Sequence, residues 1–353
     1  MVRNINLSRP FFSICIPAYN RLHHLAELLN SILAQDFDSY EILMCEDMSP
    51  QRPQIASAMA DYQKRYPGKI RYHENPVNLG YDANIRNLVA LAQGEYCFFM
   101  GNDDIMCEGA MSHVHELIGK YPNIGMVLKS YAWFDGTPDA INQEVRYFKD
   151  PVFLKAGQEA ISICFRRGGV ISGYITHRDA AFAASTDRFD GSLFYQMHMT
   201  ASVLHTKNAI TTPKVLVLCR NGEPPDFGNS ANEKGKFQPG SYTPEARLRM
   251  VGGALAIAKH FEKTTNIQIY ENIVKDYANY FFPYIRDQLG LPLKDYAALY
   301  KSYAAMGFGK YAMFHIYCVV GYALGERRFD NFTRFVRSII GRSPQFGIKR
   351  TAG

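Results

Sequence analysis

Four alternations of a short apolar run and a longer amphipathic segment occupy the first 120 residues, and no other feature constrains the fold as much. The longer segments carry apolar side chains at helical spacing, as in "RLHHLAELLNSILAQ". The short runs that precede them are residues 11–17, 40–47, 70–75 and 95–100. Alternating strands and helices predict an α/β fold with a doubly wound, mostly parallel sheet.

Polar side chains follow the four predicted strands, at the point where each strand ends. In parallel α/β sheets, ligands bind outside the carboxyl ends of the strands, because those ends meet at one edge. We therefore expect one crevice lined by the polar residues of the four tips. These residues are Tyr19, Asn20, Arg21, Glu46, Asp47, Asn78, Asn102, Asp103 and Asp104.

The fourth tip, "FFMGNDD", delivers two adjacent carboxylates to this edge. The first strand is followed by "ICIPAYNRLHHL", which lacks the glycine-rich loops of dinucleotide and P-loop sites, so bound phosphates need another counter-charge. Mg²⁺ or Mn²⁺ held by carboxylates and phosphate oxygens is the usual substitute. Adjacent aspartates after a strand also form turns and helix caps. The convergence of the four tips favours a metal site at Asp103 and Asp104.

Composition excludes several other classes of protein. Seven cysteines without CxxC spacing argue against a disulfide framework and a zinc site. No nucleic-acid-binding signature accompanies the net charge of +6, so no nucleic-acid partner is expected. No segment reaches the roughly 18 to 20 apolar residues that span a bilayer, and the N-terminus lacks a signal-peptide pattern. We therefore expect a cytoplasmic protein.

The remaining chain divides at a polar segment. Residues 124–220 look like an α+β extension with a helix near 193–204, which completes a first domain over residues 1–240. Residues 221–241 are rich in Gly, Pro, Asn and Ser, and read either as a disordered linker or as a mobile active-site lid. Residues 241–353 form a smaller helical region.

The end of this helical region combines apolar and basic side chains. Seven Lys and Arg residues stand against two acidic residues in 326–353. A basic amphipathic helix either lies on an anionic membrane, as a peripheral contact at the inner face of the cytoplasmic membrane, or packs on the first domain. The predicted apolar side is Phe332, Phe335, Val336, Ile339 and Ile340, and the basic side is Arg327, Arg334, Arg337 and Arg342.

Residues 11–110 resemble the catalytic domain of glycosyltransferase family 2, which has the GT-A fold. The resemblance lies in "FSICIPAYNR", "EILMCEDMSP" and "NPVNLGYDANIRNLVALAQGEYCFFMGNDD". It implies an inverting, metal-dependent enzyme that moves a sugar from a nucleotide-sugar donor to a hydroxyl of a growing bacterial surface glycan, such as a lipid-linked O-antigen or capsule chain. A UDP-sugar is the favoured donor, with CDP- and dTDP-sugars as alternatives.

The resemblance also implies roles for individual residues. Asp103 and Asp104 match the aspartates that hold the ribose and the metal, and Asp47 matches the residue that contacts the base. Arg220 resembles an arginine before a flexible loop that neutralises the leaving diphosphate. The other positions implied to bind substrate are Pro17, Ala18, Tyr19, Glu46, Asn78, Gly80, Arg86 and Asn102.

Two departures from the family pattern leave other functions open. Gly101 stands where the family commonly has the first aspartate of Asp-x-Asp-Asp. The Glu-Asp pair that usually supplies the general base is replaced by "STDRFDGSLFYQMHMT", where Asp190 is the first candidate, Asp187 the second and His198 an outsider. Either aspartate could instead be a first-turn helix charge. An inactive nucleotide- or glycan-binding scaffold is therefore an alternative, and a sugar nucleotidyltransferase a weaker one.

Overall fold

The structure, a computed structural model, describes residues 9–340 and the side chains of residues 9–332. Its strands are β1 (Phe12–Ala18), β2 (Tyr40–Glu46), β3 (Ile70–Glu74), β4 (Tyr96–Phe99), β5 (Ile105–Met106), β6 (Ile124–Phe134), β7 (Ile141–Val145), β8 (Phe153–Leu154), β9 (Tyr174–His177) and β10 (Asn208–Arg220). Its helices are α1 (Leu22–Leu33), α2 (Arg52–Arg65), α3 (Tyr81–Leu91), α4 (Ala110–Gly119), α5 (Gln158–Arg167), α6 (Arg178–Ala183), α7 (Tyr195–Leu204), α8 (Pro244–Thr265), α9 (Tyr270–Ala278), α10 (Leu293–Ala305) and α11 (Ala312–Ile340).

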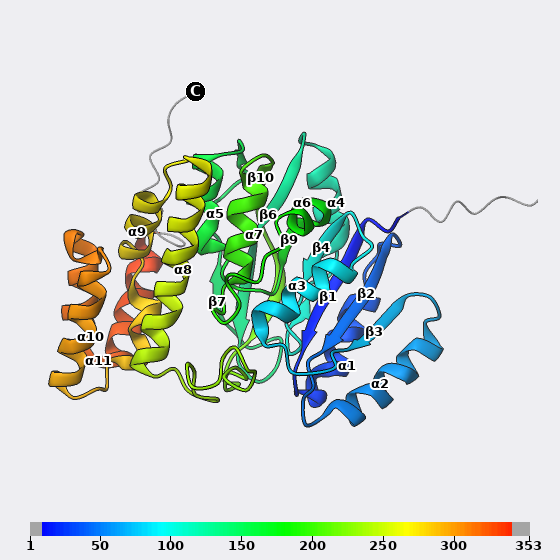
Figure 1. Ribbon diagram of the computed structural model, residues 1–353, viewed down its shortest axis with the longest axis horizontal. Helices are drawn as coiled ribbons and strands as arrows, with labels where there is room; N and C mark the ends of the chain where they lie inside the picture. Colours follow the sequence, from blue (N-terminus) through cyan, green and yellow to red (C-terminus); the bar gives the residue numbers. More distant parts are fainter. Residues whose placement is uncertain (1–8, 341–353) are drawn as a thin grey trace, which may run out of the picture.

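These strands form one mixed sheet in the order β3-β2-β1-β4-β9-β6-β10-β5, with β7 on β6 and β8 on β10 (Figure 1). Neighbouring strands run parallel from β3 to β4, as the alternating pattern predicts. Strand β9 runs antiparallel to both β4 and β6, which makes the sheet mixed. The prediction of an α/β, doubly wound fold is confirmed.

Helices cover both faces of the sheet and give the protein two apolar layers. Buried side chains of α1, α2 and α4 pack on one face, and those of α3, α5, α6 and α7 pack on the other. Alternate side chains of β1 divide between the layers, as Ile14 and Cys15 do, because successive strand residues point to opposite faces. The buried strands hold the loops at their carboxyl ends in fixed positions.

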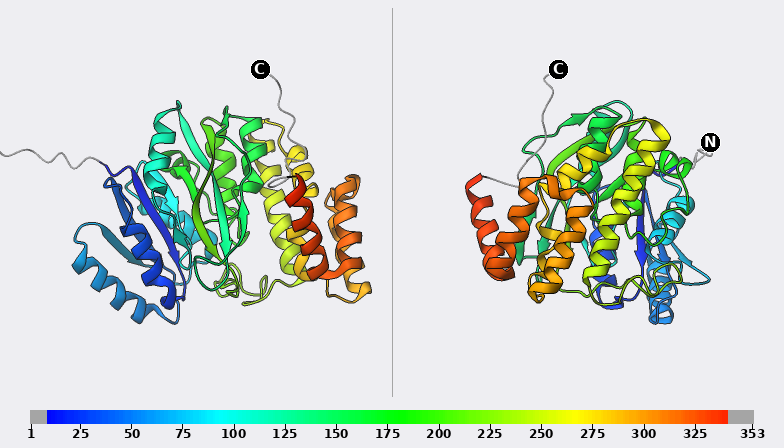
Figure 2. Two further views of the ribbon diagram at one scale, coloured as in Figure 1. Left: turned by 180° about the vertical axis from the view of Figure 1, so that it is seen from behind. Right: turned by 60° about the vertical axis from the view of Figure 1, so that its left-hand side comes forward.

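The C-terminal helices extend the second of these layers. Buried residues of α8, α9, α10 and α11 belong to the same apolar cluster as Cys15 and Leu43 of the sheet. Figures 1 and 2 show α10 and α11 at the end of the molecule opposite α2. A continuous core joins residues 241–332 to the sheet, so these helices form a wall of the molecule beside the strand tips.

The predicted C-terminal helix is present as α11, which carries a kink at Gly325. The side chains of its last residues, from Thr333 to Ile340, and the position of Arg342 lie outside the described part of the structure. Exposed apolar side chains on the described part of this helix include Ile316, Val319 and Phe332. Among the described residues, every helix is too short or too polar to cross a membrane.

Candidate active site

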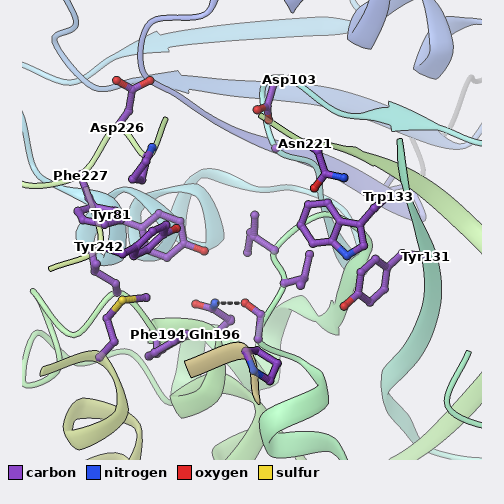
Figure 3. A pocket seen from close by; sticks show the side chains of 18 of the residues that line it. Tyr81, Asp103, Tyr131, Trp133, Phe194, Gln196, Asn221, Asp226, Phe227 and Tyr242 are labelled. Carbon is purple, nitrogen blue, oxygen red and sulfur yellow. Dashed lines mark hydrogen bonds between the residues drawn. The ribbon is translucent and has the colours of Figure 1, made fainter. Parts of the chain in front are cut away.

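A cavity of about 1100 Å³ opens at the carboxyl ends of β1, β2 and β4, where the sequence predicts a crevice. The predicted site residues that line it are Pro17, Ala18, Tyr19, Asp47, Asn78, Gly80, Asn102 and Asp103. The predicted residues outside its lining are Glu46, Arg86, Asp104, Asp187, Asp190 and Arg220. The structure thus brings residues that are predicted to form the nucleotide pocket, from the tips of all four strands, to one cavity, part of which is drawn in Figure 3.

Asp47 fixes the loop that forms one wall of this cavity. Its Oδ1 accepts hydrogen bonds from Nδ2 of Asn75 and the amide of Leu79, both at 2.8 Å, and its Oδ2 accepts one from the amide of Gly80 at 2.9 Å. Burial raises the pKa of Asp47, and these three hydrogen bonds oppose that rise because they stabilise the carboxylate. The Asp47 side chain therefore holds the end of β2 and the start of α3 together.

Asp103 faces the cavity beside an arginine that the sequence places at another strand tip. The guanidinium of Arg21 pairs with the Asp103 carboxylate, and its Nε lies 3.2 Å from Oδ2 of Asp226. Asn20 and Arg21 both have positive φ angles, 56° and 63°, a conformation that turns the chain sharply after β1. This turn brings a positive charge to the cavity wall next to the predicted metal ligand.

Asp104 points away from the cavity into a buried hydrogen-bond network. Its Oδ1 accepts the Arg220 amide at 2.8 Å, its Oδ2 accepts the Ser172 hydroxyl, and burial raises its pKa. A Cβ atom at Gly101 would lie 2.9 Å from both Asp104 Oδ2 and Ser172 Oγ. Glycine at the first position of the motif is therefore explained by the close packing of this network.

Two further residues that are predicted to bind substrate, Arg220 and Glu46, form ion pairs with other residues of the protein. The Arg220 guanidinium donates a hydrogen bond to the carbonyl of Asp103 at 3.1 Å and pairs with Glu27. The hydrogen bond fixes the backbone at the tip of β4. Glu46 is fully buried, pairs with Arg52 and accepts the amides that follow β2. Both residues shape the strand tips rather than line the cavity.

Arg86 and Asp190 form an ion pair outside the cavity lining. Nη2 of Arg86 lies 2.5 Å from Oδ2 of Asp190. The pairing is incomplete, because Nε of Arg86 and Oδ1 of Asp190 are buried and have no hydrogen-bond partner within the described structure. Burial raises the pKa of Asp190, and the charge of Arg86 opposes this. Asp187 is exposed, and His198 bonds to the carbonyl of Ala184 at 2.7 Å.

The first turn of α7 supplies a cavity residue that the sequence reasoning missed. Asp82 accepts the amides of Leu193 and Tyr195, each at 2.8 Å, and burial raises its pKa to about 7. This anchor brings Gln196 to the cavity wall, where its Nε2 donates to the carbonyl of Gly169 at 2.7 Å. Its Oε1 is buried and has no hydrogen-bond partner within the described structure.

Residues 221–241, which follow β10, cover the end of the cavity that Asp47 and Asp103 line. We call this end the donor end, because the resemblance predicts the sugar donor there. Glu233 is buried and accepts the amides of Tyr81 at 2.8 Å and Gly228 at 2.9 Å. The ring of Phe227 packs at 5.3 Å from that of Tyr242, and Figure 3 shows both rings beside Tyr81. Such packing against the cavity favours the lid interpretation of residues 221–241 over the linker interpretation.

Gly80 is where this lid meets the Asp47 loop, and its replacement provides a test. The φ of Gly80 is +82°, and a Cβ atom would lie 2.3 Å from Ser230 Oγ and 2.8 Å from Glu233 Oε1 of the lid. We expect Gly80→Ala to lower the free energy of unfolding by about 1–3 kcal/mol, measured by chemical denaturation, because backbone strain alone has that size. We also expect faster proteolysis within 221–241.

Gly68→Ala is the matched control, because Gly68 also has a positive φ, +76°, but a Cβ atom there would meet nothing within 4 Å. We expect that variant to leave the proteolysis of residues 221–241 unchanged. Equal cleavage rates in the two variants would show that Gly80 does not hold the lid.

Beyond the donor end, the cavity extends to the C-terminal helices. Trp133 of β6 lies between Asn221 and Tyr131 in Figure 3. Farther along, the wall is formed by Arg166, Arg167, Tyr280 and Tyr284. Sequence reasoning missed this end, because the residues come from segments more than 100 positions apart and carry no motif.

Comparison with known proteins gives the family. Residues 13–187 match the sequence model of glycosyl transferase family 2. The abequosyltransferase RfbV of Salmonella typhimurium is 36% identical over 100 residues, which are 28% of this chain and 30% of that protein. The poly(ribitol-phosphate) β-N-acetylglucosaminyltransferase TarP of Staphylococcus aureus is 26% identical over 122 residues, 34% of this chain and 36% of that protein. The alignments therefore span about a third of each relative.

Among solved structures, S. aureus TarS 1–349 in complex with UDP-GlcNAc matches 96% of this chain and 94% of its own, with a TM-score of 0.58 and 15% identity. This likeness extends the shared fold through the C-terminal helices, well beyond the segment that matches in sequence. It agrees with the GT-A-type sheet and with the cavity at its strand tips. This chain carries a glycosyltransferase family 2 domain of the GT-A fold.

Proposed function

We propose that this protein transfers a sugar from a nucleotide-sugar donor to a hydroxyl of a bacterial surface glycan, with inversion at the transferred carbon and with Mg²⁺ or Mn²⁺. The observation that carries the proposal is the joint lining of one cavity by Asp47, Asn102 and Asp103 within the family 2 domain. Two relatives support a surface glycan as acceptor by their names, the poly(ribitol-phosphate) β-N-acetylglucosaminyltransferase TarP and the "putative colanic acid biosynthesis glycosyl transferase WcaA" of Escherichia coli.

A UDP-sugar is the favoured donor, and CDP- and dTDP-sugars are the alternatives. The S. aureus TarS complex with UDP-GlcNAc, which shares the fold, supports this preference. Asp47 is proposed to contact the base, and Asp103 the ribose and the metal. Both carboxylates are nearly buried, at 4% and 8% exposure, so a ligand that fits there meets fixed partners.

The carboxylates at the tip of β4 are the proposed ligands of the divalent cation. Mg²⁺ takes one or two carboxylates plus phosphate oxygens, and Asp103, which pairs with Arg21 in this structure, is the first of these ligands. Asp104 is the second proposed ligand, although its oxygens bond to Ser172 and to the Arg220 amide. A bound cation would neutralise the charge that develops on the leaving diphosphate.

The protein's own residues are proposed to do the rest. Arg21 lines the cavity beside Asp103 and Arg220 does not, so Arg21 is better positioned to neutralise the leaving diphosphate. The segment 221–241 is proposed to exclude water from the donor, which limits hydrolysis. Gln196 offers its unpartnered Oε1 to a substrate hydroxyl.

Asp190 is the proposed general base, with Asp187 as the second candidate, and its test is a pair of variants. A general base contributes about 10²–10⁴ to the rate, so we expect Asp190→Asn to lower transfer at least about 100-fold while nucleotide affinity stays within about threefold. Asp187→Asn is the matched control and should keep most of the rate. Asp190 must leave Arg86 to reach the cavity, and full activity of Asp190→Asn would assign the base elsewhere.

The acceptor is proposed to be lipid-linked, with the protein in peripheral contact with the inner membrane face. The exposed apolar residues of α11, which include Ile316 and Val319, support this, as does the basic sequence that follows. Anionic lipids attract such basic segments.

The proposed activity is tested by incubating the protein with UDP-, CDP- and dTDP-sugars, with Mn²⁺ or Mg²⁺, and measuring release of the nucleoside diphosphate. We expect slow release from one nucleotide class, faster with acceptor glycan. A second candidate is an inactive nucleotide- or glycan-binding scaffold, which Gly101 and the position of Asp190 outside the cavity favour. Tight binding without release, in the presence of acceptor, would select the scaffold.

A further inference from the structure

The far end of the cavity contains two arginines that share one carboxylate. Arg166 and Arg167 end α5, and Asp276 of α9 lies between their guanidiniums. Asp276 Oδ2 lies 2.6 Å from Nε of Arg166 and 3.1 Å from Nη1 of Arg167, and Asp276 Oδ1 lies 2.8 Å from Nη2 of Arg167. Both arginines line the cavity. Two positive charges therefore face a single negative charge.

This surplus charge is buried. The side chains of Arg166 and Arg167 are 9% and 4% exposed, and burial opposes ionisation of Asp276, yet the two guanidiniums hold its pKa below the ordinary value. Within the described structure, the hydrogen bonds of Arg166 use its Nε and Nη2, which leaves Nη1 for a ligand. A buried cation without its own counter-ion favours an anionic ligand.

Other charges at this end of the cavity are paired closer to solvent. Arg247 pairs with Asp287 at 2.9 Å, and Arg286 pairs with Glu326 and Asp330. Arg286 is 52% exposed, so solvent screens its pairs strongly. Arg286 thus faces two carboxylates, a negative surplus that lies nearer to solvent than Arg166 and Arg167, whose side chains are 9% and 4% exposed.

Aromatic side chains line the same cavity as this charge. Trp133 and Tyr131 lie on β6 with ring centroids 5.9 Å apart, and the Arg166 guanidinium lies over the Tyr280 ring at 4.8 Å. Planar aromatic faces and amide side chains are typical of sites that hold polar organic ligands. The cavity, at about 1100 Å³, exceeds the roughly 300–1,000 Å³ of a pocket for one ligand. Its lining also continues from Asp103 at the tip of β4 to Tyr280 and Tyr284 of the C-terminal region.

We propose that Arg166 and Arg167 bind a phosphate or carboxylate group of the acceptor glycan, with Trp133 beside the sugar that receives the transferred residue. This inference rests on the proposed function and specifies the acceptor as anionic. It also gives the C-terminal region a role, because Tyr280 and Tyr284 line the cavity and Asp276 holds the two arginines. This region is then part of the acceptor site.

The sequence provides a reporter for this test, because Trp133 is the single tryptophan of the chain. Its fluorescence is followed while the full-length protein is titrated with glucose 1-phosphate, with glucuronate and with neutral glucose. We expect a saturable change with at least one anionic probe and none with glucose at the same concentration. Response to glucose 1-phosphate alone identifies a phosphate ligand, and response to glucuronate alone a carboxylate ligand. Trp133→Phe should abolish the signal.

Two variants of opposite charge separate binding from structure. Arg166→Gln removes the surplus positive charge and should lower the affinity for the anionic probe at least about tenfold. Asp276→Asn increases the surplus positive charge and should raise that affinity. A purely structural cluster would lose affinity in both variants. Arg166→Lys keeps the positive charge, so its affinity for the anionic probe should stay within about threefold of the wild-type affinity. This variant replaces Asp276→Asn in the test if circular dichroism shows that Asp276→Asn does not fold.

Arg21→Gln shows whether the probe binds at the donor end instead. We expect this variant to bind the probe as the wild type does and to lose affinity for nucleoside diphosphates. Equal response to glucose and to the anions, or loss of the signal in Arg21→Gln rather than Arg166→Gln, would overturn the inference. Such a result would leave nucleotide binding intact, so it differs from failure of the proposed glycosyltransferase function, in which no nucleotide binds.

Discussion

Asp103→Asn is expected to lower the rate of nucleoside diphosphate release at least about 100-fold, because removal of one preorganised electrostatic group costs 10²–10³ in rate. The variant keeps the size of the side chain but removes the one charge of the "GNDD" tip that faces the cavity. It also leaves Arg21 with Asp226 as its ion-pair partner and with the Pro224 carbonyl as a further acceptor. The measurement is the initial rate of nucleotide release at saturating donor and Mn²⁺.

The matched control for this variant is Asp61→Asn on α2, because that carboxylate is 67% exposed and lies outside the cavity. We expect it to keep the wild-type rate. If Asp103→Asn also retained the rate within about threefold, the tip of β4 would have no part in donor chemistry. The metal and ribose roles proposed for Asp103 would then both fail.

Asp47→Ala is expected to affect stability and donor binding together. It leaves the backbone amide of Leu79 without its acceptor, whereas the Asn75 side-chain amide keeps Asn84 Oδ1 and the Gly80 amide keeps Asn78 Oδ1. An orphaned buried donor costs about 1–3 kcal/mol, so we expect the free energy of unfolding to fall by about 1–3 kcal/mol. Because the same loop lines the cavity, nucleotide affinity should fall at least about tenfold.

Chemical denaturation measures the first effect, and calorimetric titration with nucleotide, at a temperature where the variant is folded, measures the second. Asp36→Ala is the control, since Asp36 is an exposed aspartate that follows α1. A variant that loses stability but keeps full nucleotide affinity would reduce Asp47 to a structural residue. Unchanged stability would contradict the described hydrogen-bond network itself.

The core of the fold was predictable because the central strands are buried on both faces. All seven residues of β2 are buried, and a continuous apolar run of that kind is visible in sequence. The antiparallel strand β9 was only half visible in "VISGYITH", because Gly173, with a φ of +75°, turns the chain before Tyr174. Strands β5 and β8 have two residues each and carry no pattern.

The position of the site in the fold was predictable from the sequence, but the directions of its side chains were not. Strand ends fix where Asp103 and Asp104 lie, yet only the structure shows that Ser172 and the Arg220 amide take Asp104 inward. A contact such as Arg166 with Asp276 joins residues 110 positions apart and has no local signal. The motif positions were therefore accessible from sequence, whereas the charge balance of the cavity depends on long-range packing.

The central claim is that the cavity at the ends of β1, β2 and β4 binds the nucleoside diphosphate of a sugar donor. The most direct test is calorimetric titration of the wild type and Asp103→Asn with UDP, CDP, GDP and dTDP, each with and without Mn²⁺. We predict that one nucleotide binds the wild type, more tightly with Mn²⁺, and that Asp103→Asn weakens that binding at least about tenfold. Absence of binding by all four nucleotides, or equal affinity in the variant, would contradict the claim.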